Sequence, residues 1–301
     1  MTDQTLVAVL AALFGASTTA LGTALQQRAT QLVPPGRRMW LALARRPSWL
    51  AGVALVGVGF AGYLTALAHG TLALTQPIMI SGLAFGSLFS AWLARRRPDP
   101  LLVAGTVTSW AGLALLLGAA RPTAAPGPHG TAAGGWWLAL ALGAALMTAL
   151  LVAALGRGLH RALGYAVASG LLFGGNAALA KLVADQLAHG WAEPARHWPV
   201  YAMLLVAPAG FLLSQRAMQL SRLLAPVNAV ISSVDPVTAV AIGLVVLGER
   251  IADSPAALGA QCLAGALLLT GIIMITRRGA RLHEAHRAAR TGRERAALGW
   301  G

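Results

Sequence analysis

The sequence predicts an all-α membrane protein that crosses the bilayer nine times. Hydrophobic residues make up 57% of the 301 residues, only 11% are charged, and the hydrophobic residues cluster in blocks. Each block has about 20 residues, the length that a helix needs to cross a bilayer, whereas a transmembrane β-barrel would show alternating segments of about ten. The nine expected spans are 5–26, 49–69, 72–93, 101–120, 135–156, 163–185, 199–217, 223–247 and 256–276.

The basic residues predict the orientation of these spans. Of the 23 Lys and Arg residues, 19 lie in or at the edge of connections that nine spans place on one side, three lie on the other side, and Lys181 lies within a span. Cytoplasmic connections carry the basic excess, so we expect the N-terminus outside and the C-terminus inside. The orientation in the membrane therefore explains the net charge of +14, and we expect no nucleic-acid partner. Abundant Ala, Gly and Arg are typical of a GC-rich bacterium, which suggests the inner (plasma) membrane as the location.

Three pairs of similar segments indicate an internal repeat. LFGASTTALGTALQQ from Leu13 resembles LFGGNAALAKLVADQ from Leu172, and WAGLALLLG from Trp110 resembles LAGALLLTG from Leu263. Leu74-Thr-Gln-Pro77 likewise resembles Leu224-Ala-Pro226. The pairs join spans 1 and 6, 3 and 8, and 4 and 9, and an offset of five spans inverts the second copy. Inverted repeats are typical of secondary transporters.

This repeat divides the chain into an inverted 4+1+4 arrangement. The expected units are a four-helix repeat at 1–120, an outer linker at 121–134, a linking fifth helix at 135–160, an inverted four-helix repeat at 161–276 and a basic cytoplasmic tail at 277–301.

Asp235 is the first candidate functional residue, because it lies near the middle of the eighth span and Pro236 follows it directly. A carboxylate at membrane depth usually faces a protein interior or a hydrated path. The proline disfavours helical backbone at the residue before it, so we expect a broken helix here. Asn228, Ser232 and Asp235 follow helical spacing and share one face. A structural network of hydrogen bonds between helices is the alternative explanation.

Lys181 is the only lysine, and it lies nearer the outer surface than Asp235. Its side chain can snorkel to the headgroups and pair there with Asp185, one turn further along the helix. A direct ion pair or coupling between Lys181 and Asp235 is the second option. Small residues at Gly170, Gly174 and Ala178 predict close helix packing in the same span.

Other polar residues and prolines complete the candidate site. Asn176 in the sixth span, Ser17 in the first and Ser81 in the third lie at depths suited to a central cavity. Prolines inside or at the start of spans are candidate hinges, and they are Pro77, Pro208, Pro226 and Pro236. We expect no cofactor, no metal-ligand set and no catalytic motif. Cys262 is the only cysteine, which excludes an intrachain disulfide.

The eighth span and its exit, APVNAVISSVDPVTAVAIGLVVLGERI, resemble the drug/metabolite transporter superfamily and its EamA-like members. The shared pattern is an Ala-Pro entry at Pro226, a mid-span Pro236 and Leu-Gly-Glu at 247–249. The following LAGALLLTGIIM resembles that superfamily's last helix, with Gly265 and Gly271. The likeness covers most of residues 5–276 and implies a carrier.

A nine-span layout, rather than ten spans, is similar to the magnesium transporters related to the NIPA proteins. Trp49, Gly52 and the run 72–77 fit that branch. The branch has an acidic residue in its second span, about where Gly59 or Phe60 stands, and this chain has none there. Mg²⁺ prefers several oxygen ligands, and Asp235 is the only carboxylate at mid-depth.

We therefore expect a carrier that moves a small organic solute or a cation by alternating access, with Asp235 binding a cationic substrate or exchanging a proton. A magnesium transporter of the NIPA type is the alternative, and a membrane scaffold or sensor that uses the basic tail is a third hypothesis. The expected partners are the solute or cation and membrane lipid, with a homodimer as one option. An enzyme is not expected.

Overall fold

A computed structural model shows an all-helical chain, described here for residues 3–31, 43–93, 100–122, 132–220, 224–271 and 273–274. No strand occurs among these residues. The helices are α1 (Asp3–Gln31), α3 (Pro47–His69), α4 (Leu72–Ile80), α5 (Gly82–Leu93), α6 (Pro100–Ala120), α7 (Ala132–Leu155), α8 (Gly158–Leu187), the 3₁₀ helix η1 (Glu193–Arg196), α9 (Trp198–Leu220), α10 (Leu224–Val245) and a final helix, Pro255–Gly271.

Seven segments of the described chain are long and apolar enough to cross a membrane, with α4 and α5 counted together as one. The apolar stretches Val230–Val245 and Pro255–Gly271 are shorter. These helices are what the expected class, a polytopic helical membrane protein, requires. The tail 277–301 and most of the linker 121–134 lie outside the described residues.

The third span is broken, and the break lies one turn beyond Pro77. α4 ends at Ile80, Ser81 forms a turn, and α5 begins at Gly82. The predicted break at Asp235-Pro236 is wrong, because α10 runs as one α-helix through Pro236. α9 likewise continues through Pro208. A proline removes one backbone donor, but unwinding the helix in lipid would leave several more groups unpaired.

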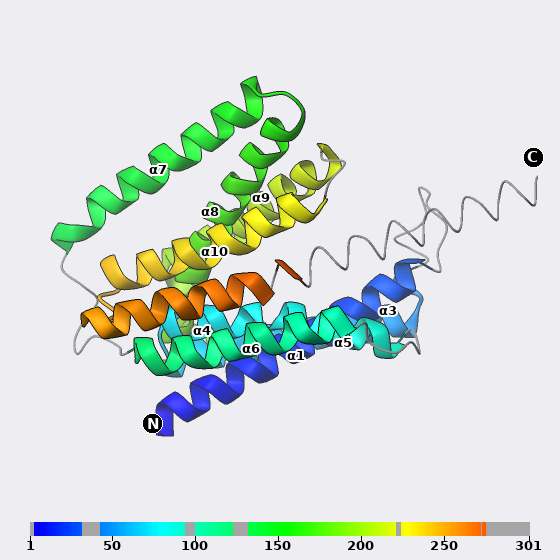
Figure 1. Cartoon of the computed structure of the whole chain (residues 1–301), viewed down its shortest axis with the longest axis horizontal. Helices are drawn as coiled ribbons and strands as arrows, with labels where there is room; N and C mark the ends of the chain where they lie inside the picture. The colour runs from blue at the N-terminus through cyan, green and yellow to red at the C-terminus, as the bar shows by residue number, and fades with distance from the viewer. Residues whose placement is uncertain are drawn as a thin grey trace, which may run out of the picture.

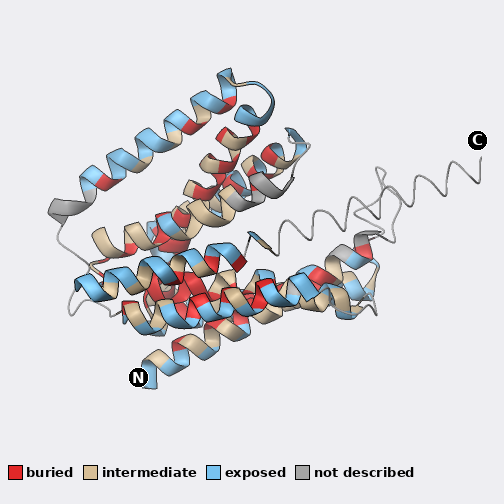
Figure 2. Ribbon diagram, viewed as in Figure 1, coloured by how far each residue is buried: buried red, intermediate tan, exposed pale blue. Residues whose placement is uncertain are grey.

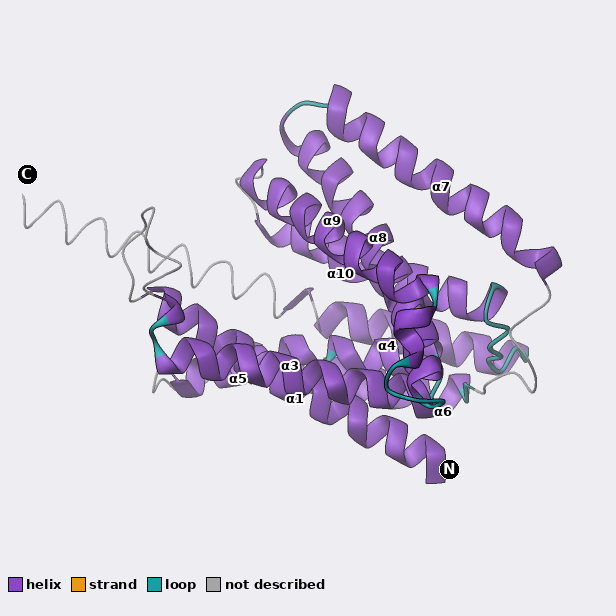
Figure 3. Ribbon diagram, turned by 180° about the vertical axis from the view of Figure 1, so that it is seen from behind, coloured by secondary structure: helices purple, strands orange, loops and turns teal. Residues whose placement is uncertain are grey.

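The helices form two sets that meet at one end of the molecule (Figure 1). In the first set α1 packs along α3 and against α4 and α5, and in the second α8 packs against α7, α9 and α10. α3 contacts α8 and α4 contacts α10 where the sets meet, and toward the opposite end the sets lean apart (Figures 1 and 3).

The final helix packs against α6 through small residues. A Cβ built at Gly112 would lie 2.5 Å from the backbone nitrogen of Leu268, and one at Gly271 would lie 2.5 Å from the carbonyl oxygen of Gly105. The matched segments 110–118 and 263–271 therefore lie against each other. The loop before this helix is also anchored to α6, because the Ala252 nitrogen donates to the carbonyl of Ala120 at 2.8 Å.

Buried residues gather where the two sets of helices meet, while the outer faces are apolar and exposed (Figure 2). On α7 and α9, large side chains such as Leu140, Leu151, Leu205 and Leu212 are all more than half exposed. A soluble protein rarely leaves such long apolar faces uncovered. These faces suit contact with lipid tails.

Close packing of α1 on α3 depends on glycines. A Cβ built at Gly59 would lie 2.8 Å from the backbone nitrogen of Thr19 and 2.9 Å from the carbonyl oxygen of Gly15. One at Gly22 would lie 2.6 Å from the carbonyl oxygen of Gly52. Since these obstacles are backbone atoms, a side chain at these positions forces the two helices apart.

Replacing Gly59 with alanine is therefore expected to lower the free energy of unfolding by about 1–3 kcal/mol, the usual cost of overpacking. The matched control is Gly57→Ala, on the same helix, where an added Cβ meets nothing within 4 Å. Alanine favours helix over glycine, so the control is expected to be neutral or slightly stabilising. Melting curves of the two purified variants test this, and equal melting temperatures would contradict the packing argument.

Candidate substrate site

Asp235 lies at the contact between α10 and α8. A Cβ built at Gly174 would lie 2.5 Å from the carbonyl oxygen of Asp235, and one at Gly170 would lie 3.3 Å from its nitrogen. The predicted small-residue packing in the sixth span is thus confirmed, and it holds the Asp235 backbone directly against α8. The position of the carboxylate along the molecule is fixed by these two glycines.

The Asp235 side chain is half-buried, and its carboxylate forms no hydrogen bond or ion pair with the residues that the structure describes. It lies close enough to the Tyr63 hydroxyl of α3 for the two groups to interact electrostatically. That hydroxyl accepts a hydrogen bond of 3.1 Å from the Gln76 amide of α4. We call Tyr63, Gln76 and Asp235 the junction site, because each comes from a different helix where the two sets meet.

Tyr63 carried no signal in the sequence. It lies in an apolar span, and the residues one turn before and after it are all nonpolar (Gly59, Phe60, Ala66 and Leu67). Only the fold brings it toward Asp235. Gln76 was noticeable as the polar residue before Pro77, but nothing indicated its partner.

Ser17 and Ser81 lie near the crossing of α1 with the α4–α5 break. Ser81 is buried and its hydroxyl has no partner among the described residues. Gly82, next to it, lies beside Ala16, since its built Cβ would be 3.5 Å from the Ala16 carbonyl oxygen. The Ser17 hydroxyl donates to the carbonyl of Phe14 in its own helix at 3.0 Å, so Ser17 is locally satisfied.

A hollow of about 410 Å³ lies beside this crossing. Its lining comes from α1, α4 and α5 and is made mainly of small or apolar residues, with hydroxyls from Thr19, Thr23 and Ser90. Its volume falls within the range of small-molecule pockets. Asp235 is not part of its lining.

The remaining predicted residues are only partly brought together. Ser232 is half-buried on α10, three residues before Asp235, and the side chain of Asn228 lies outside the described part of the chain, as does that of Pro226. Asn176 has a buried side-chain oxygen without a hydrogen-bond partner among the described residues. By helical spacing it shares the face of Ser169, whose hydroxyl donates to Gly210 of α9 at 2.9 Å. Asn176 therefore lies on the α9 side of α8, away from the α10 contact.

Lys181 does not pair with Asp235. Its ammonium group donates to Asp185 Oδ1 at 2.8 Å, which confirms the predicted i,i+4 pair, and to the carbonyl oxygen of Leu67 at 2.7 Å. The Lys181 side chain is only 14% exposed, so it turns into the contact between α8 and α3 instead of snorkelling outward.

Glu249, which follows α10, was not among the predicted site residues. Its buried carboxylate accepts hydrogen bonds from the first two amides of α4, at 2.5 Å from Leu72 and 3.0 Å from Ala73. Thr71 completes this helix start by accepting from the Leu74 nitrogen at 3.1 Å. Burial raises the pKa of the Glu249 carboxyl, and the nearby Asp185 adds to this, while the two amides and Lys181 oppose it.

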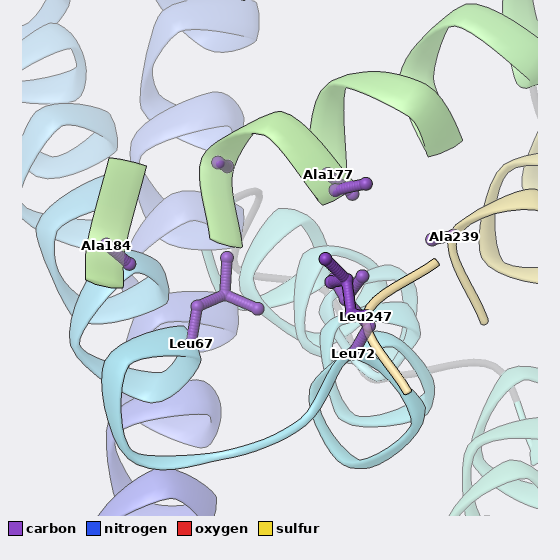
Figure 4. Close-up of a cluster of buried hydrophobic side chains, with 8 residues drawn as sticks. Leu67, Leu72, Ala177, Ala184, Ala239 and Leu247 are labelled. Carbon is purple, nitrogen blue, oxygen red and sulfur yellow. The ribbon is translucent and has the colours of Figure 1, made fainter. Parts of the chain in front are cut away.

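An apolar cluster joins the two sets of helices (Figure 4). It lies beside these charges, because Lys181 and Glu249 bond to the backbone of its members Leu67 and Leu72. Leu67 of α3 and Leu72 of α4 meet Ala177 and Ala184 of α8 there, together with Leu247 from the exit of α10. All five are buried. We call this region, with Lys181 and Glu249, the Glu249 end of the molecule.

The described residues contain no group of three or more His, Cys, Asp or Glu side chains that could hold a metal ion. At Gly59, one of the two positions where an acidic residue would be expected by resemblance to the magnesium transporters, the backbone of α1 occupies the space that a side chain would need.

Comparison with known proteins leaves the function open. An uncharacterized protein of Corynebacterium glutamicum is 29% identical over 256 residues, which cover 82% of this chain and 87% of that protein. No family model and no solved structure matches the chain.

Proposed function

We propose that this protein is a secondary transporter of the drug/metabolite transporter type, EamA-like, in a bacterial inner membrane. It moves a small organic solute or a cation by alternating access, with nine spans, an outer N-terminus and an inner C-terminus. Asp235 binds the cationic part of the substrate or exchanges a proton for it.

The observation that carries this proposal is an ionisable carboxylate without a protein partner among the described residues, at the contact between two sets of membrane helices. A charge at membrane depth without a partner is costly, so such a residue usually marks the path of a substrate or an ion. A purely structural acid would be expected to have a hydrogen-bond donor beside it.

The packing of the helices supports alternating access. If spans 1 to 4 repeat as spans 6 to 9, then α1 on α3 is equivalent to α8 on α9, and both pairs pack closely. The contact of α3 with α8 is equivalent to a contact of α9 with α1, and the described residues show no comparable contact there. Two inverted copies in unequal arrangements are what a carrier closed at one end requires, because exchanging the arrangements gives the other state.

No observation favours the magnesium alternative. The described group that interacts with Asp235 is the neutral hydroxyl of Tyr63, whereas Mg²⁺ is usually bound through carboxylates and phosphates. The scaffold hypothesis depends on the tail 277–301, which lies outside the described residues.

A thermal-shift screen of the purified full-length chain tests the proposal. Organic amines, amino acids and divalent cations are added separately, and a ligand at 100 times its dissociation constant stabilises the folded state by about 2.7 kcal/mol. We expect a small organic cation to raise the melting temperature of the natural protein and not that of Asp235→Asn. Stabilisation by Mg²⁺ alone, equal in both proteins, would overturn the assignment.

A further inference from the structure

Two charged side chains, one on α8 and one in the loop after α10, hold the short connection between α3 and α4. Only Gly70 and Thr71 separate these helices. Lys181 of α8 donates to the Leu67 carbonyl at the end of α3, and Glu249 accepts from the first two amides of α4. The first contact joins the two sets of helices, and the second joins the exit of α10 to the start of α4.

Each charge has the sign that its helix end favours. The last carbonyls of a helix carry partial negative charge and the first amides carry partial positive charge. A lysine at the end of α3 and a glutamate at the start of α4 therefore stabilise both termini, and they satisfy backbone groups that have no partner within their helices. Charge-assisted hydrogen bonds of this kind are stronger than neutral ones.

The surroundings of Glu249 make the contact tight. A Cβ built at Gly243 of α10 would lie 2.6 Å from Glu249 Oε2 and 3.2 Å from the Leu72 Cβ. A side chain at this position would push the Glu249 carboxylate away from its place at the start of α4. Leu72 also belongs to the apolar cluster shown in Figure 4.

We propose that Lys181 and Glu249 form a latch that holds the Glu249 end closed, and that the transport cycle opens this end by releasing both contacts. This inference rests on the proposed function, and it assigns a gate to residues that are remote from Asp235. The latch acts on backbone groups at the tips of α3 and α4, so its release frees these helices to move away from α8 and α10.

Keeping Glu249 ionised in the closed latch has an electrostatic cost, which suits a contact that must open. Burial opposes the ionised form of Glu249 and raises its pKa, and the Asp185 carboxylate faces it as a like charge. Lys181 faces it as the compensating charge, and the Leu72 and Ala73 amides donate to it. Without Lys181 the carboxylate would lack its nearest cation among these groups.

A cysteine placed beneath the latch reports opening without requiring transport. In a Cys262→Ala background, Ala177→Cys puts a thiol one turn below Lys181 within the buried cluster. A separate Ala195→Cys protein, exposed in η1, shows which membrane side the Glu249 end faces. The measurement is the labelling rate by a membrane-impermeant, charged methanethiosulfonate, applied to cells and to inverted vesicles.

We expect slow labelling of Ala177→Cys from the side of the membrane on which Ala195→Cys is labelled. Adding Glu249→Gln or Lys181→Met should make this labelling about tenfold faster, because a hydrogen bond to a charged group contributes more free energy than a tenfold change in an equilibrium constant requires. The control is Glu193→Gln. It breaks an ion pair of 2.6 Å with Arg196 within η1, at the same end but without crossing between the sets, and is expected to leave the rate unchanged.

Unchanged labelling in either folded latch variant overturns the latch. If Glu249→Gln does not fold, as judged by its melting curve, Lys181→Met decides the question. Labelling does not depend on transport, so the two proposals can fail separately. An unchanged labelling rate in a protein that transports would contradict only the latch. Faster labelling in a protein that transports nothing would contradict only the proposed carrier function.

Discussion

Asp235→Asn is expected to reduce transport by about 100-fold or more while leaving the melting temperature nearly unchanged. Loss of one partner from a buried charge contact costs about 2–5 kcal/mol, which corresponds to this range. The fold loses little, because the carboxylate forms no hydrogen bond or ion pair with the described residues. Uptake into proteoliposomes, with the substrate found by the thermal-shift screen, is the measurement.

The matched control is Asp253→Asn, which makes the same chemical change at an exposed position after α10. Its transport should equal that of the natural protein. Full uptake in Asp235→Asn would remove this residue from the mechanism, and a large fall in its melting temperature would show a structural role instead.

The second large effect is expected for Gly174→Val. The first added carbon already meets the Asp235 carbonyl oxygen and the Thr238 Cβ at 2.5 Å, and a branched side chain adds two more methyl groups. The expected loss is about 3 kcal/mol of unfolding free energy, the upper part of the usual range for overpacking. Displacement of α10 also moves Asp235 relative to Tyr63, so transport should fall in whatever protein remains folded.

Gly175→Val separates this effect from helix propensity. The change is identical and one residue away, but an added Cβ at Gly175 meets nothing within 4 Å. Melting temperature and uptake of the two variants are compared directly. Equal behaviour would mean that the contact of α8 with α10 does not depend on Gly174.

The class of the protein and several local features were predictable because they depend on short-range patterns. Block length predicts helices that can cross a membrane, four-residue spacing predicted packing at Gly170 and Gly174, and one-turn spacing predicted the pair of Lys181 with Asp185. Each of these signals lies within a single helix, where the geometry is fixed by 3.6 residues per turn.

Contacts between distant parts of the chain could not be predicted in this way. Glu249 lies 177 residues from Leu72, and no spacing rule links them. The approach of Tyr63 to Asp235 also arises only when separate helices pack. The prediction of a break at Pro236 was wrong for a related reason. The sequence rule considers only the one hydrogen bond that proline removes, whereas in lipid every further unpaired backbone group adds to the cost of unwinding the helix.

Lys181 and Glu249, which bind on either side of the two-residue turn at Gly70 and Thr71, could not exchange places. In an ordinary salt bridge the acid and the base can trade places, since each is the other's complement. Here each faces peptide groups, and the direction of the polypeptide decides that carbonyls end α3 and amides begin α4. In a chain with glutamate at 181 and lysine at 249, the carboxylate would face the α3 carbonyl and the ammonium group would face the α4 amides, which is unfavourable at both sites. The direction of the main chain therefore constrains these two positions.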